Sequence, residues 1–541
     1  MDKKMLTTTV DYLFHQSESR GQESAISFKK DNKWEDISWA QYYSDVETAA
    51  SSLISMGVSK GDKVCILGFN CYEWVVFDLA AIMIGAIPAG IYATCSAQEI
   101  EYILNHSQSS VLLIEDVLQW EKIQTQRDKL TSLKHIITMI RSEDIEDDIV
   151  IKWNDFLNKA TDENRVKAKK VLSQLKPEME ATYIYTSGTT GPPKAVMLSN
   201  NNIVWTADHA VTMLKLDHDN TSLSYLPLSH IAEQMFTIHG PIIAGWKVYF
   251  ATGLIDVLDN LKEVQPTILF GVPRIWEKFY SGIKEKLAEA AGVKKSIADF
   301  ALNAGLNSSL DRFSGGAGGG IKYNLANKLL FNKVKSALGL NNLRLGVTGA
   351  APINSDILKM FASLDILVIE VYGQSEGSGP TTFNRPWDNK MGSVGPSFYG
   401  TEVKLADDGE IMLRGPNVFL GYYRDKNATD ECLKDGWLYS GDVGKFEDKF
   451  LYVTGRKKEI LVTSGGKNIA PILIEEELKQ IPLIAQAVMV GDNRNYCTAL
   501  LTLDVGYLLK YKMSMDISNV SPLDLLNTLE SNGKMVSDFA N

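Results

Sequence analysis

Short apolar runs alternate with helix-like segments through the first part of the chain, and this alternation is the strongest constraint on the fold. Residues 63–68, 87–91 and 110–114 have the apolar composition of buried strands. Residues 74–85 and 97–106, which lie between them, have the apolar spacing of helices. Strands and helices that alternate in this way form parallel sheets covered by helices. The sequence therefore predicts a doubly wound α/β fold.

The length of the chain and a change in its secondary-structure pattern predict more than one domain. The chain has 541 residues, several times the usual size of one domain. The α/β pattern continues to about residue 380, where short alternating strands and turns replace it. We predict three parts: a large N-terminal domain of stacked α/β sheets over residues 1–380, a small β-rich subdomain over 381–457, and a small α+β C-terminal domain over 458–541.

A loop rich in hydroxyls and glycines follows a strand-like segment at 181–185. It reads YTSGTTGPPKAVM over residues 185–197. Glycines let backbone N–H groups approach a ligand closely, and successive N–H groups form a concave anion site. This composition suits a polyphosphate, and the alternative is a flexible polar loop without a ligand. The side chains add four hydroxyl donors and one positive charge: Thr186, Ser187, Thr189, Thr190 and Lys194.

Three later segments also carry groups suited to nucleotide chemistry. In VYGQSEG, Tyr372 can stack on a purine, Gly373 permits a turn, and Glu376 is a hard oxygen ligand suited to Mg²⁺ on phosphates. In WLYSGDVG, the Asp442 carboxylate can accept two hydrogen bonds from a ribose diol. YLPLSH ends in His230. Taken singly, each has a plainer interpretation: a turn, a solvated carboxylate or a structural histidine.

Together and in this order, these segments resemble the signatures of the AMP-forming acyl- and aryl-CoA synthetases, the adenylate-forming superfamily. The resemblance runs from about Thr8 to about Asp504. Within the superfamily the chain is most similar to the bubblegum type of long-chain acyl-CoA synthetase, in segments that include ILGFNCYEW, GVPRIWEK, YGQSEGSGP and GRKKEILVTSGGKNIAP.

The resemblance implies an acid–thiol ligase with residues 1–380 as its AMP-binding core. It implies that a long-chain fatty acid, ATP and CoA are the substrates and that Mg²⁺ is required. The fatty acid would be activated to acyl-AMP with release of pyrophosphate. Transfer of the acyl group to CoA would then release AMP. Other carboxylic acids, whether aromatic, short-chain or amino acids, remain alternatives to the fatty acid.

The resemblance also implies roles for individual residues. Lys194, Glu376 and His230 would be catalytic, with Glu376 the metal ligand. Lys458 would be the hinge about which the C-terminal domain rotates. The remaining predicted cofactor-binding residues are those of the phosphate loop, of the adenine and ribose sites and of the pantetheine channel: Thr186, Ser187, Gly188, Thr189, Thr190, Gly191, Tyr372, Gly373, Asp442, Arg456 and Gly466.

The C-terminal region departs from the family pattern. Members carry a lysine near the end of this domain that contacts the α-phosphate during adenylation. Asn532-Gly533-Lys534 matches that box only superficially, because the expected basic continuation is missing. We therefore expect an incomplete C-terminal domain. This leaves an alternative function, a nucleotide- and acyl-binding protein that does not adenylate.

Charge and cysteine content restrict partners and location. The net charge is −11 and no long basic block is present, so a nucleic-acid partner is disfavoured. Five widely spaced cysteines fit a reducing compartment. The N-terminus lacks the apolar core of a signal peptide, and the apolar run from Leu79 to Ile91 is too short to span a bilayer. We expect a cytoplasmic protein without a transmembrane segment, and leave open peripheral contact with the endoplasmic reticulum membrane.

A glycine-rich stretch at 306–320 contains SGGAGGG. This composition predicts a mobile loop. Such a loop either covers a functional site or is an insertion without a role, and the sequence favours the insertion.

Overall fold

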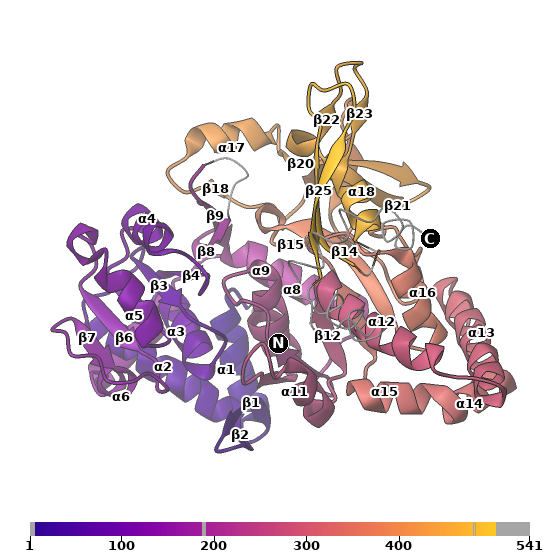
Figure 1. The fold of residues 1–541 in the computed structure, drawn as a ribbon. Coiled ribbons are helices and arrows are strands. Elements are labelled where there is room, and N and C mark those ends of the chain that lie inside the picture. Colours follow the sequence, from indigo (N-terminus) through magenta and orange to yellow (C-terminus); the bar gives the residue numbers. More distant parts are fainter. Residues whose placement is uncertain (1–5, 187–190, 480, 482, 505–541) are drawn as a thin grey trace, which may run out of the picture. The chain divides into compact units, whose positions relative to one another are not determined.

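Two eight-stranded sheets with helices around them make up most of the structure (Figure 1). The computed structural model describes residues 6–186, 191–479, 481 and 483–504. They form two compact units. The first holds the described residues up to Ala351, with Ser355–Ser440 and Phe446–Tyr452; the second holds Pro352–Asn354, Gly441–Lys445 and the described residues from Val453.

The first sheet has the strand order β18-β9-β8-β4-β3-β5-β6-β7. The strands from β8 to β7 in this order are parallel, whereas β9 is antiparallel to both β8 and β18. The parallel order confirms the predicted α/β pattern. The bounds are β3 Lys63–Leu67, β4 Ile87–Ile91, β5 Val111–Ile114, β6 His135–Thr138, β7 Val150–Lys152, β8 Glu180–Thr186, β9 Lys194–Ser199 and β18 Gly421–Tyr422.

The second sheet has the order β15-β14-β13-β12-β10-β11-β1-β2. Its inner strands are parallel, and β15 and β2 are antiparallel edges. The bounds are β1 Ser24–Lys30, β2 Lys33–Ser38, β10 Thr221–Ser224, β11 Lys247–Phe250, β12 Ile268–Gly271, β13 Leu345–Thr348, β14 Val368–Gln374 and β15 Gly379–Phe383.

Helices cover these sheets, and one of them is buried on every side. In α3, every residue from Glu73 to Met83 is buried, and all of them except Glu73 and Asp78 are apolar, as expected of a helix inside a large core. The segment Leu79–Ile91 is thus a buried helix that continues into β4, as predicted, and no helix in the described ranges has the length and apolarity needed to cross a membrane. The helices of this half are α1 Thr9–Arg20, α2 Trp39–Ser55, α3 Tyr72–Met83, α4 Ala97–Ser107, α5 Val117–Gln124, α6 Trp153–Leu157 and α7 Asp162–Leu172.

The helices around the second sheet include a long excursion between β12 and β13. It consists of α12 Pro273–Ala288, α13 Val293–Phe313, α14 Ile321–Ala326, the π-helical turn η3 Asn327–Phe331 and α15 Asn332–Leu338. The other helices are α8 Asn200–Leu214, α9 Ile231–Gln234, the π-helical turn η2 Met235–His239, α10 Gly240–Ala244, α11 Val257–Val264 and α16 Ser355–Ser363.

The structure corrects the prediction of a loop at 306–320. Residues 306–313 belong to helix α13, and only 314–320 form the connection to α14. The backbone N–H of Gly318 donates to Asp311 Oδ2 at 2.8 Å, and that of Gly319 donates to Ser308 Oγ at 2.7 Å. The glycine cluster allows the chain to fold back onto α13, since Gly318, Gly319 and Gly320 all have positive φ.

Smaller sheets follow in the last third of the chain. A five-stranded sheet contains β16 Glu402–Leu405, β17 Glu410–Arg414, β19 Leu433–Lys434, β20 Trp437–Glu447 and β21 Phe450–Arg456, and α17 Lys426–Cys432 precedes β19. The second unit adds β22 Leu461–Val462, β23 Asn468–Ile469, α18 Pro471–Leu478, β24 Ile484–Val490 and β25 Thr498–Leu503. The proposed division at 380 and 457 stays a prediction.

Helix α13 packs closely on α16 at Gly305, which gives a testable prediction. A Cβ at Gly305 would lie 2.1 Å from the carbonyl oxygen of Ser363 and 2.8 Å from the Phe331 ring. Gly305→Ala should therefore lower the free energy of unfolding by about 1–3 kcal/mol in urea denaturation. Gly282→Ala is the matched control in α12, where a Cβ meets nothing within 4 Å. It should raise the free energy of unfolding by about 0.5–1 kcal/mol. Equal effects of the two substitutions would contradict this packing.

Candidate active site

The predicted phosphate loop connects two strands of one hairpin. Thr186 is the last residue of β8, and it pairs with Lys194, the first residue of β9. Gly191 is exposed, with φ at +114°, a backbone conformation that favours glycine. Ser187, Gly188, Thr189 and Thr190 lie outside the described residues. The hairpin fixes both ends of the loop, so Thr186 and Lys194 are held side by side.

Lys194 and Glu376 are brought together by Tyr422, a residue that the sequence analysis missed. The Tyr422 hydroxyl donates to Glu376 Oε1 at 2.6 Å, and Lys194 Nζ lies 5.0 Å from the Tyr422 ring centroid. Tyr422 lies on β18, which pairs with β9, whereas Glu376 follows β14 of the other sheet. The arrangement therefore joins the edge strand β18 of the first sheet to the end of β14 in the second. The one sequence feature that could have indicated Tyr422 is the pair of tyrosines in FLGYYRD, a segment without a recognised motif.

Burial keeps this tyrosine protonated. Burial, with the nearby Glu376 carboxylate as a second cause, raises the pKa of Tyr422. Its hydroxyl therefore stays a hydrogen-bond donor to the carboxylate at neutral pH. Lys194 also lies 4.0 Å from Asp425 Oδ2, with both side chains about 40% exposed. So long and so solvated an ion pair is weak, and the ammonium can bind another anion.

The carboxylate of Glu376 is suited to bind a magnesium ion that also binds a nucleotide. Glu376 Oε2 accepts no hydrogen bond from a described residue, while Oε1 is fixed by Tyr422. No cluster of three or more metal-binding side chains occurs in the part of the chain that the structure describes. A Mg²⁺ ion here would take Glu376 as its protein ligand and complete its shell with phosphate oxygens and water, which is the usual pattern for this ion.

Tyr372 and Gly373 lie at the end of β14, before Glu376. The predicted turn at Gly373 is wrong, because this residue pairs within the β14–β15 ladder. A Cβ at Gly373 would lie 1.7 Å from the carbonyl oxygen of Gly379. Strand packing alone therefore requires glycine at this position. Its role beside a nucleotide stays a prediction, as does that of Tyr372.

His230 caps helix α9 with its side chain. The backbone N–H of Ala232 donates to His230 Nδ1 at 3.1 Å, so the proton of the neutral ring is on Nε2. Burial lowers the pKa of His230, which favours that neutral form. The segment before it packs against β4, because a Cβ at Gly90 would lie 2.7 Å from Ser229 Cα.

A buried polar junction holds the segment that ends at His230. Glu233 Oε1 accepts from Ser224 Oγ and Thr237 Oγ1, both at 2.8 Å, and from the backbone N–H of Tyr225 at 3.2 Å. Asn70, which follows β3 of the other sheet, donates to Leu226 O and accepts from the Leu228 N–H. The sequence analysis assigned neither residue a role, although Asn70 lies within the segment ILGFNCYEW and Glu233 lies three residues after His230.

The other predicted residues belong to the second unit. Arg456 Nε lies 3.3 Å from Asp442 Oδ1, so the structure brings these two together as an ion pair. Lys458 lies in the short 3₁₀ turn Lys457–Glu459, directly after β21. Gly466 lies in the turn between β22 and β23 with φ at +77°. The predicted roles of these four residues stay predictions, and Lys534 lies outside the described residues.

Comparison with known families identifies this arrangement. The family described as AMP-binding enzyme matches residues 13–423, and the AMP-binding enzyme C-terminal domain matches residues 458–518. The chain belongs to the AMP-binding enzyme family. Similar members include the long-chain-fatty-acid–CoA ligase ACSBG2 of Xenopus laevis, 38% identical over 92% of this chain and 69% of that protein, and ACSBG2 of Homo sapiens, 39% identical over 96% and 79%. ACSBG1 of Homo sapiens is 34% identical over 92% and 71%.

Solved structures show the same fold. The anthranilate CoA ligase AuaEII, in complex with anthranoyl-AMP, superposes with a TM-score of 0.73 at 20% identity and covers 97% of this chain and 93% of its own. A fatty acyl CoA synthetase of Mycobacterium tuberculosis has a TM-score of 0.67 at 20% identity, over 96% and 93%. These likenesses confirm the predicted fold of a large domain of α/β sheets with a smaller C-terminal domain.

The buried Glu233 predicts a pH-dependent stability. Burial raises the pKa of this carboxyl from 4.5 to about 7. The native state therefore keeps a proton that the unfolded chain releases, and the stability this gives is full below pH 4.5 and is lost as the pH rises to about 7.

Glu233→Gln keeps the acceptor oxygen and cannot ionise. Relative to the wild type, its free energy of unfolding should rise by up to about 3 kcal/mol between about pH 5 and about pH 8. Urea denaturation at both pH values measures this difference. An offset from the wild type that is the same at both would contradict the assignment.

Proposed function

We propose that the protein is an AMP-forming long-chain fatty acid–CoA ligase. One observation carries the proposal: Lys194 and Glu376, on different sheets, meet at Tyr422 beside a hydroxyl- and glycine-rich hairpin. That is a cation and a carboxylate placed to hold a nucleotide polyphosphate with its metal ion. The names of the similar family members favour a long-chain fatty acid as the acid and CoA as the thiol.

The reaction has two steps. A fatty acid carboxylate oxygen attacks the α-phosphorus of ATP, pyrophosphate leaves, and acyl-AMP forms. The CoA thiol then attacks the acyl carbon, loses its proton, and AMP leaves. Catalysis of displacement at phosphorus consists mainly of positioning and charge neutralisation, so no nucleophilic side chain is required.

In the first step, Lys194 and the hairpin loop hold the β- and γ-phosphates. When bound, Mg²⁺ neutralises charge on the phosphate oxygens. Tyr422 keeps the Glu376 carboxylate in one orientation by its 2.6 Å hydrogen bond, and its protonated hydroxyl adds no negative charge beside the nucleotide. Lys194 and Tyr422 are fixed by the paired strands β9 and β18, and this supports the assignment.

In the second step, His230 offers its Nε2 proton as a hydrogen-bond donor near the acyl group. We assign Tyr372 and Gly373 to the adenine site, Asp442 to the ribose diol and Arg456 to ribose or phosphate. Lys458 would be the hinge residue, and Gly466 would line the channel for the pantetheine arm. The Asp442–Arg456 ion pair supports a joint role, since one carboxylate and one guanidinium at 3.3 Å can bind adjacent groups of one nucleotide.

We infer a cytoplasmic location, at the cytosolic face of the endoplasmic reticulum. The five cysteines, all within the described residues, are free thiols, which supports a reducing compartment.

Release of AMP tests the proposed function. The purified chain should release AMP from MgATP only when a long-chain fatty acid and CoA are both present. Lys194→Ala should lower the rate about 100-fold or more, because removing a preorganised charge from a reacting phosphate site has that order of effect. Lys30→Ala, at an exposed lysine of β1, should leave it unchanged. ATP binding without AMP release would instead favour the non-adenylating binding protein, and release with aromatic or short-chain acids alone would favour another ligase.

Tyr422 allows a finer prediction. Tyr422→Phe removes the hydrogen bond to Glu376 but keeps the ring under Lys194, so kcat/KM for MgATP should fall about 10- to 100-fold, the usual effect of losing one hydrogen bond to a charged group. Tyr423→Phe, the adjacent half-buried tyrosine, is the matched control and should change it little. Steady-state AMP release at varied MgATP gives both values. A Tyr422→Phe protein with unaltered kcat/KM would show that the hydroxyl does not position Glu376.

A further inference from the structure

Positive charge is concentrated in the helical excursion between β12 and β13. Residues 273–338 contain eleven lysines and arginines but five aspartates and glutamates, in a chain whose net charge is −11. The excursion thus carries a net charge of +6 while the rest of the chain is strongly acidic. A segregation of this kind gives one part of the surface an attraction for anions that the molecule as a whole lacks.

Apolar side chains are exposed within the same excursion. Helices α13 and α14 each begin after a glycine, and their first residues are Val293 and Ile321. Val293 is 76% exposed and Ile321 is 90% exposed. One helical turn further on, Ile297 and Leu325 are also exposed, and side chains four residues apart lie on one face of a helix.

Lysines flank these apolar residues. Lys294 and Lys295 follow Val293, and Lys322 follows Ile321, with Lys328 two turns further along. All four are exposed, and none forms an ion pair with any residue in the described ranges. We call the set of four apolar residues and four lysines the docking face: Val293, Lys294, Lys295, Ile297, Ile321, Lys322, Leu325 and Lys328.

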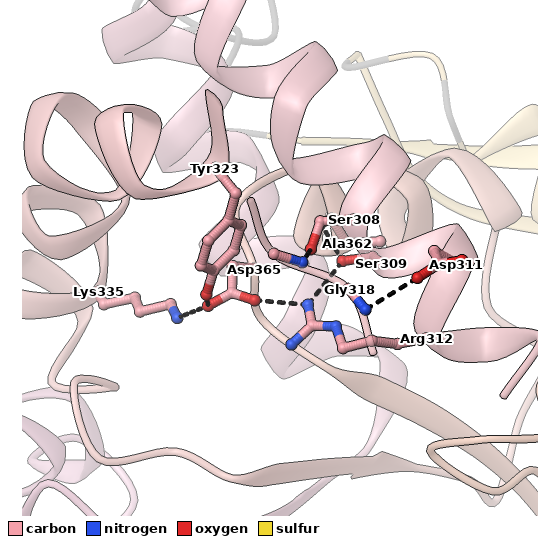
Figure 2. A network of polar contacts seen from close by, with 10 residues as sticks. Ser308, Ser309, Asp311, Arg312, Gly318, Tyr323, Lys335, Ala362 and Asp365 are labelled. Carbon is pink, nitrogen blue, oxygen red and sulfur yellow. Dashed lines mark hydrogen bonds and ion pairs between the residues drawn. The ribbon is translucent and has the colours of Figure 1, made fainter. Parts of the chain in front are cut away.

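The docking face is carried by helices that are fixed to the sheet. Figure 2 shows Asp365, in the turn between α16 and β14, as the centre of a polar network. It accepts from Arg312 Nη2 and Lys335 Nζ at 2.5 Å and from the Tyr323 hydroxyl at 2.7 Å. These three donors come from α13, α15 and α14 in turn. This one carboxylate thus joins the C-terminal end of α13 to α14 and α15.

We propose that the docking face binds the surface of an anionic lipid bilayer. Its four apolar side chains would enter the headgroup region while the lysines contact lipid phosphates and carboxylates. Exposed apolar residues flanked by unpaired lysines are the pattern of interfacial helices, and each lysine near an anionic membrane contributes an attraction. Nucleic acid is disfavoured, because the face offers no aromatic side chain for stacking on bases. A second copy of the chain is disfavoured, because two such faces would repel each other.

Vesicle flotation with the purified full chain tests the proposal. The protein should float with phosphatidylcholine vesicles that contain phosphatidylserine, and little with phosphatidylcholine alone. High salt should weaken the binding by screening. Lys295→Glu with Lys322→Glu should weaken it by about tenfold or more, since two attractions become repulsions. Val293→Ser with Ile321→Ser should weaken it at any salt concentration, and both replacements lie at exposed first residues of helices, so folding should be retained.

Matched controls lie on α7, which packs on α2 and α3. Val166 is 69% exposed there, and Lys167 and Lys170 are exposed. Lys167→Glu with Lys170→Glu, and Val166→Ser, should leave flotation unchanged. Equal binding to neutral vesicles, unchanged binding by both docking-face variants, or equal losses in the controls would overturn the proposal. So would retention on RNA in the absence of vesicle binding. AMP release by the same variants without vesicles should match the wild type, which separates this test from that of the proposed function.

Discussion

The structure depends on a buried polar junction between its two large sheets. Asn70 follows β3 of one sheet and donates to Ser224 Oγ of the other at 2.8 Å, while Glu233 Oε1 accepts from the same hydroxyl. Buried polar groups are stable only when they are hydrogen-bonded, so the junction fixes how the two sheets meet. The segment that ends at His230 is held by this junction, and its position therefore follows from the packing of the sheets.

The candidate active site also takes its residues from both sheets. Lys194 and Tyr422 come from the edge of the first sheet, and Glu376 comes from the end of β14 in the second. Further hydrogen bonds hold the turn after Glu376 against the segment before β18. Asn417 donates to Gly377 O, and Ser378 donates to Asn417 O. A cation and a carboxylate on separate sheets remain apart until the sheets pack. The polyphosphate site is thus a product of tertiary structure.

Much of the fold could be predicted from local patterns. The apolar runs that became β3, β4 and β5 and the buried helix before β4 are readable because burial on both faces demands continuous apolar sequence. Tyr422 and Glu233 could not be predicted in this way, because their partners lie 46 and 163 residues distant along the chain. Gly373 was assigned to a turn because glycine permits one, yet the close pairing of β14 with β15 is what requires it. The end of α13 was missed because the glycine cluster after it suggested a longer loop.

In the proposed reaction, a fatty acid carboxylate attacks the α-phosphorus of ATP. The most direct test uses a long-chain fatty acid with both carboxylate oxygens replaced by ¹⁸O, incubated with the purified chain, MgATP and CoA. The AMP formed should carry one ¹⁸O atom, because the bridging oxygen of acyl-AMP leaves with the phosphate when the thiol attacks. Unlabelled AMP, or label in inorganic phosphate alongside ADP, would contradict this mechanism.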